Sequence, residues 1–268
     1  MQPNMNLSYL KQIRQISAII PAHYLLLGLC LIFQVGSYSQ SNRDPTPAER
    51  VVINKVVNTV SQVIDRFSDK NWVKTRGGGM DQQNYSVQEH PDVAMGVAPF
   101  DDWQFDVVEN SPLWNSTIKP SMDKLANIPA DLTDKKTMDE YLKLGNDLKN
   151  LQHIYVEVHV NEKNLPIKPA QGSAIDLKVP GCYFSYKQSL NNTVGTNLNP
   201  ENSYVFAFGN WGNAKYDANL EVYQFHFGHP PGTAFIENLV IIVSGNNEAI
   251  QRMIKSEKFM MINEGLTK

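Results

Sequence analysis

The sequence predicts an α+β domain: a twisted antiparallel β-sheet of about five to six strands, mostly in the C-terminal half, with α-helices packed on one face. Three observations support this fold class. Strand-like segments separated by turn residues fill the last third of the chain. No helical pattern of about 10–15 residues separates them, which favours antiparallel neighbours over parallel βαβ units. Helical patterns lie on both sides of this region and can cover one face of the sheet.

The N-terminal residues have the layout of a secretory signal. Residues 1–39 include Lys11 and Arg14 but no Asp or Glu, and an apolar run over residues 24–36 follows these cations. Small residues then precede the expected cleavage point between Ser39 and Gln40. We therefore expect residues 1–39 to be a signal peptide and residues 40–268 to be a single α+β domain, located outside the cytoplasm in the periplasm or as a secreted protein.

Two other interpretations of this segment are a lipoprotein anchor and an uncleaved membrane anchor. A lipoprotein anchor at Cys30 needs a small residue before the cysteine, and Leu29 stands there instead. An uncleaved membrane anchor is the second alternative, because residues 16–36 approach the roughly 20 residues that a membrane span requires. Pro21 and His23 interrupt that stretch, which favours a cleaved signal. Membrane association follows only if the segment is retained.

Charge and cysteine content exclude some functions. The whole chain has a net charge of −3, and loss of the two cations in residues 1–39 makes it more acidic. Nucleic-acid binding relies on clustered Lys and Arg, so no nucleic-acid partner is expected. Cys182 is left without an intramolecular disulfide partner once Cys30 is removed, and we expect a buried, inert thiol.

Helix signals occur at four places. The residues Thr46-Pro47-Ala48-Glu49 form a capping-box start, and the apolar spacing after them predicts a helix to about Ser68. A second helix is expected over residues 134–150, where Met138, Tyr141, Leu142 and Leu148 recur at helical spacing. A short helix is expected over residues 121–127. The last runs over residues 247–257, with Asn246 or Asn247 as its cap.

The clearest strand is His153–Val160, in which Ile154, Val156, Val158 and Val160 alternate with polar residues. This period of two predicts one buried and one polar sheet face. The other expected strands are shorter or less regular. They cover a segment within residues 97–112 and the ranges 182–188, 204–208, 220–227 and 236–243.

Five residues are predicted to bind a ligand. Tyr155, Glu157 and His159 share the polar face of the 153–160 strand, and His226 is the candidate partner from a neighbouring strand. Trp211, in the loop "FGNWGN", is expected to be exposed, where its ring can stack on a sugar or peptide. Residues two apart on a strand lie about 6.6–6.8 Å apart, so His153 and His159, which are six residues apart, are separated by about 20 Å. They therefore cannot bind the same metal ion.

No catalytic residue, metal ligand or cofactor is assigned. The chain has no Gly-x-Ser-x-Gly or His-Glu-x-x-His sequence, and the glycines at 77–79 lack the Lys-Ser/Thr that completes a phosphate loop. The sequence favours an exported, non-catalytic binding or accessory module whose partner is an unknown ligand or an envelope protein. The alternatives are a hydrolase using Glu157, His159 and His226, with or without a metal, and an envelope protein tethered by its N-terminal helix.

Overall fold

A computed structural model describes residues 42–77, 85–89, 92–98, 102–128, 134–166, 174–188, 203–220, 222–255 and 259–266. These residues belong to one compact unit, Asn42–Lys268. The expected signal peptide lies outside the described residues, as do two of the three glycines at 77–79.

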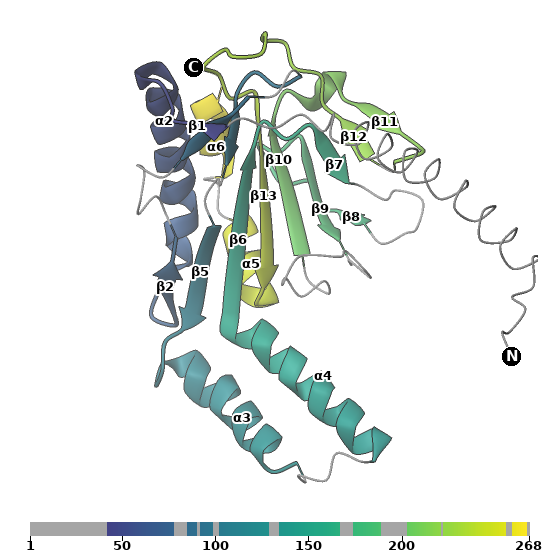
Figure 1. The fold of residues 1–268 in the computed structure, drawn as a ribbon. Coiled ribbons are helices and arrows are strands. Elements are labelled where there is room, and N and C mark those ends of the chain that lie inside the picture. Colours follow the sequence, from purple (N-terminus) through teal and green to yellow (C-terminus); the bar gives the residue numbers. More distant parts are fainter. Residues whose placement is uncertain are drawn as a thin grey trace, which may run out of the picture. The chain divides into compact units, whose positions relative to one another are not determined.

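The main sheet has seven antiparallel strands, one or two more than expected, and five of them follow residue 150. The predicted fold class is confirmed. The connectivity is not a simple meander, because β13 lies between β6 and β10 rather than at an edge (Figure 1). In spatial order the strands are β2 (Trp72–Arg76), β5 (Asp102–Val107), β6 (His153–Val160), β13 (Asn238–Gly245), β10 (Ser203–Gly209), β9 (Phe184–Gln188) and β8 (Ala174–Asp176).

Helix α2 (Pro47–Ile64) begins at the predicted capping box. The Thr46 hydroxyl accepts a hydrogen bond from the Glu49 amide at 3.3 Å, and the Thr46 amide donates to the Glu49 carboxylate at 2.7 Å. A 3₁₀ turn, η1 (Asp65–Phe67), continues the helix almost to the expected end. The valine-rich stripe of α2 is buried, so packing on the sheet outweighs the low helix propensity of valine.

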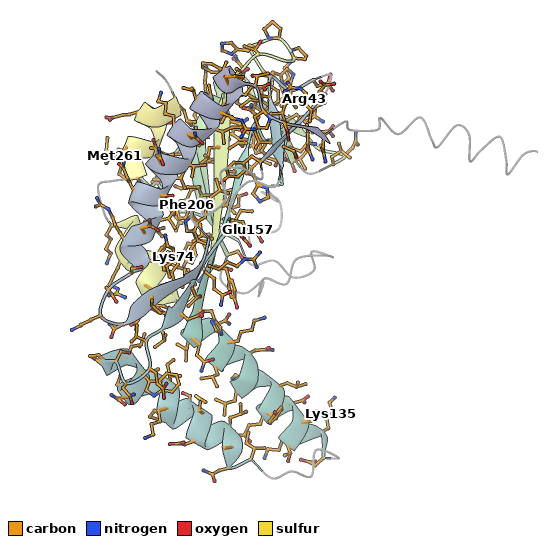
Figure 2. The ribbon with its side chains drawn as sticks, turned by 60° about the vertical axis from the view of Figure 1, so that its left-hand side comes forward. Arg43, Lys74, Lys135, Glu157, Phe206 and Met261 are labelled. Carbon is orange, nitrogen blue, oxygen red and sulfur yellow. The ribbon has the colours of Figure 1, made fainter. Side chains whose placement is uncertain are left out.

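One face of the sheet is covered by α2, α5 (Asn247–Ile254) and α6 (Met260–Leu266) (Figure 1). The start of α5 is confirmed, since the Asn246 side chain accepts from the Ala249 amide. Helix α6 was not predicted. In Figure 2 the labelled Phe206 lies on the helix side of the sheet and Glu157 on the opposite side. The four apolar side chains of β6 face the helices and join their core.

A small sheet covers part of the opposite face. Its strands are β11 (Lys215–Asp217), β12 (Val222–Gln224) and β7 (Asn164–Pro166), in that order. Leu165 of β7 packs in a second core with Val205 and Ala207 of β10 and Val240 of β13. The opposite face is therefore apolar where the small sheet covers β10 and β13 and polar along β5 and β6, whereas the sequence predicted one uniformly polar face. A third sheet joins β1 (Asn42–Arg43), β3 (Ser86–Gln88) and β4 (Gly96–Ala98).

Helices α3 (Lys119–Ala126) and α4 (Lys135–Gln152) extend past the end of the sheet (Figure 1). A π-helical turn, η2 (Trp114–Ile118), precedes α3. The helix predicted over residues 134–150 is confirmed, but its apolar residues do not form one buried stripe: Leu148 is buried, whereas Tyr141 and Leu142 are exposed. The reason is geometric, because only the C-terminal end of α4 reaches the sheet, and Lys135 at its other end lies far from it (Figure 2).

Candidate functional site

The candidate site is the part of the sheet that neither the helices nor the small sheet covers. Antiparallel pairing of β5 with β6 places Asp102 opposite Glu157, Gln104 opposite Tyr155, and Asp106 opposite His153. Directly opposed side chains have Cβ atoms about 4.5–5.5 Å apart, so these pairs can interact. We call this surface the open polar face; it consists of Asp102, Gln104, Asp106, His153, Tyr155, Glu157 and His159.

Its charged side chains are 26–49% exposed, whereas the alternate residues of β6 are buried under the helices. The predicted division of β6 into a core face and a polar face is therefore confirmed. Tyr155, Glu157 and His159 lie together on the polar face, as expected. Sequence reasoning did not select Asp102, Gln104 or Asp106 for this face. The alternation in "DWQFD" around Trp103 and Phe105 carried the necessary signal, but the pairing register of β5 with β6 did not follow from it.

His153 and Asp106 form the tightest contact of the face, with Nδ1 and Oδ1 2.7 Å apart. The Gln104 amide nitrogen also donates to Asp106 Oδ1, at 2.8 Å. Burial alone would raise the pKa of Asp106, but the hydrogen bonds from Gln104 and His153 outweigh it and hold that pKa below its ordinary value. An ionised carboxylate only accepts hydrogen bonds, so Nδ1 of His153 carries the proton in this pair.

His159 lies between two carboxylates. Its Nε2 is 3.6 Å from a carboxylate oxygen of Glu157, and its Nδ1 is 3.8 Å from one of Glu162. The Glu157 carboxylate is the largest cause that raises the pKa of His159; burial opposes it, and the charge of Glu162 adds to it. Since the two carboxylates face different ring nitrogens, they cannot join His159 in binding one metal ion. Among the residues that the structure describes, no group of three His, Cys, Asp or Glu side chains could hold one.

Tyr155 lies at the centre of the face, between the His153 and Glu157 positions of β6. Its ring centroid is 5.7 Å from that of His153, with the planes tilted by 39°. Burial and the negative charge of Asp106 raise the pKa of the Tyr155 hydroxyl. The phenol is therefore neutral at physiological pH, and it offers a ligand an aromatic surface and a hydroxyl group.

Trp211 is not exposed, which corrects the expectation for the loop "FGNWGN". The residue is 1% exposed, and its indole nitrogen donates to the Phe208 carbonyl at 3.0 Å. Its ring packs edge-on against Phe225, with centroids 4.9 Å apart. Loops that turn between two sheets can bury a large side chain, and here the tryptophan fills the second core instead of facing solvent.

His226 lies just after β12 and is exposed. Its Nδ1 is 3.3 Å from the Gln224 carbonyl oxygen. Within the described ranges, no hydrogen bond or ion pair joins it to Glu157 or His159. Of the three residues in the hydrolase alternative, the structure thus brings Glu157 and His159 together but shows no interaction of either with His226.

Cys182 is partly buried, whereas the sequence predicted a buried thiol. It forms no disulfide within the described residues and packs beside the main core, and burial raises its pKa. A thiol held in the protonated form is a poor nucleophile.

Comparison with known proteins adds no assignment: no family model matches the sequence, and no curated protein or solved structure is significantly similar to it. None of the helices in the described ranges has both the length and the apolar character needed to cross a membrane.

Proposed function

We propose that the protein is an exported, non-catalytic binding or accessory module that acts in the periplasm or outside the cell. Its ligand or envelope-protein partner contacts the open polar face. The observation that carries this proposal is the combination of partly exposed His, carboxylate and Tyr side chains on two neighbouring inner strands, β5 and β6, whose other face is committed to the core. Rigid strands hold such side chains at fixed separations, which suits selective binding.

Three of the predicted ligand-binding residues, Tyr155, Glu157 and His159, form the proposed contact surface. Trp211 is withdrawn as a direct contact because it is buried. Export is supported by the layout of residues 1–39, with two cations followed by an apolar run and small residues.

Binding is tested with isotope-labelled protein and NMR titrations of three probe sets: short peptides, oligosaccharides and small amines. The proposal expects at least one probe to shift the resonances of Tyr155, Glu157 and His159, and the Tyr155→Ala variant to weaken that binding. Binding probes whose shifts all map to other surfaces, such as α3 and α4, would overturn it.

Export is tested separately by sequencing the N-terminus of the protein recovered from cells. The proposal expects the chain to begin at Gln40. A chain that retains residues 1–39 and stays with the membrane fraction would instead support the tethered envelope protein.

A further inference from the structure

The open polar face carries an unusual arrangement of negative charge. Asp102 lies directly opposite Glu157 across two paired strands, and like charges in that position repel. Arg76 pairs with Asp102 at 3.1 Å, whereas the contact of Glu157 in the described part of the chain is the His159 ring at 3.6 Å. The face therefore presents more carboxylates than permanent cations, which favours a positively charged ligand.

A second, independent observation comes from buried hydroxyl groups beside this charge. Ser244 of β13 is paired with Tyr155, and Ser203 of β10 is paired with Ser244, so all three share one face of the sheet. The two serines are 1% and 0% exposed, and neither hydroxyl has a hydrogen-bond partner among the residues that the structure describes. Native proteins pair nearly all buried polar groups. A main-chain amide or carbonyl of a ligand seated beside Tyr155 would supply the partner of Ser244.

The spacing of the carboxylates indicates how a ligand is arranged. Asp102 and Asp106 lie four residues apart on β5, which separates them by about 13 Å along the strand. An extended polypeptide repeats this distance between its own residues i and i+4. A single small amine can reach one of these carboxylates but not both.

We infer that the open polar face binds an extended segment of a polypeptide with two basic side chains four residues apart. One cation pairs with Asp106 and the other with Asp102 and Glu157. Tyr155, between these two positions, contacts the intervening residues of the ligand. This inference rests on the proposed function and names the chemistry of its partner.

The test uses fluorescence anisotropy of a labelled peptide of glycine and serine that carries lysines at positions three and seven. The comparison probes are a peptide with lysines at positions three and five, a peptide with glutamates at three and seven, and spermine. The inference expects the first peptide to bind most tightly and rising salt to weaken it, because exposed ion pairs are screened.

Three variants locate the binding. Asp106→Asn and Glu157→Gln are each expected to raise the dissociation constant about fivefold, the effect of removing one partly exposed ion pair. Asp102→Asn is the third variant. Loss of the Asp102 charge removes its repulsion with Glu157, so this substitution should not prevent folding. The matched control is Asp147→Asn, an exposed carboxylate on α4, which is expected to leave the affinity unchanged.

Equal affinity for the lysine and glutamate peptides, tighter binding of spermine than of either peptide, or wild-type affinity in all three variants would overturn the inference. A neutral or acidic probe that shifts Tyr155, Glu157 and His159 while the lysine peptides do not bind would leave the proposed function standing and remove only the basic ligand. Binding of the lysine peptide that Asp147→Asn weakens and Glu157→Gln does not would overturn both.

Discussion

The side chains of His153 and Asp106 contact each other at one end of the open polar face, with Nδ1 and Oδ1 2.7 Å apart across the paired strands β5 and β6. The pair lies at the end of the face where α4 leads into β6, since His153 follows directly after that helix. It thus fixes the position of the polar side chains nearest to the helical extension.

The Asp106 contact predicts a pH dependence. Because the folded pKa of Asp106 is lowered, its bonds stabilise the fold above the ordinary value of 3.8, and this contribution is lost as pH falls below that value. The His153→Ala variant is expected to raise the pKa of Asp106 and to lose less stability on acidification than the wild type. Carboxyl carbon NMR checks the first expectation, and denaturant unfolding at several acidic pH values checks the second. An unchanged pKa of Asp106 in His153→Ala would contradict this account.

His159 is expected to titrate above its ordinary pKa of 6.5, because the Glu157 and Glu162 carboxylates favour the charged ring. Any stability that this raised pKa contributes is fully present below pH 6.5 and is lost as pH rises through the folded value. The ring-proton NMR titration should show a lower pKa in Glu157→Gln than in the wild type, with Glu162→Gln giving a smaller change. An equal pKa in all three proteins would show that neither carboxylate acts on His159.

Glu49 is expected to contribute more to stability than the carboxylates of the open polar face, because it is buried. It is 2% exposed, and its two oxygens accept from the Arg43 guanidinium at 2.7 and 2.8 Å, which holds its pKa at about 2. Glu49→Gln should lower the free energy of unfolding by about 2–3 kcal/mol, since it weakens a bidentate pair and leaves Arg43 half-buried. Denaturant titration measures this loss.

The matched control for Glu49 is Glu89→Gln, which removes the exposed partner of the same arginine and should cost less than about 1 kcal/mol. The Glu49 contribution is present above its ordinary pKa of 4.5 and is lost as pH falls toward 2, so the two variants should converge in stability at low pH. Equal losses at neutral pH would refute the special role of Glu49.

Trp211 is expected to act on stability and not directly on ligand binding. Trp211→Ala removes a ring from the second core and should cost about 3–5 kcal/mol of unfolding free energy. Trp211→Phe, which retains most of the apolar contact, should bind probes of the open polar face as the wild type does. A loss of probe affinity in Trp211→Phe without a loss of stability would restore Trp211 as a contact residue.

Local signals in the sequence were sufficient for several elements. The capping box at Thr46 and Glu49 predicted the start of α2, and the period of two in β6 predicted which of its residues are buried. Both depend on neighbours in the chain alone. The polar side of β6 was identified for the same reason.

Features that depend on distant partners were not predictable. The register that brings Asp106 to His153 requires knowledge of which strands pair. The small sheet that buries Trp211 is built from strands of three residues each, too short for a periodic signal. The continuous apolar runs of β10 and β13 did indicate that both faces of these strands are covered. A strand with one polar face alternates between apolar and polar residues, and these two strands do not.

The central claim is that a ligand covers the open polar face, and carboxyl labelling with a carbodiimide and an amine, read by mass spectrometry, tests it most directly. In the free protein, Asp102, Glu157 and Asp147 should be modified while buried Glu49 is not. With saturating lysine peptide, the account predicts that labelling of Asp102 and Glu157 falls while that of Asp147 stays the same. Unchanged labelling of Asp102 and Glu157 under saturation, or protection confined to Asp147, would contradict the account.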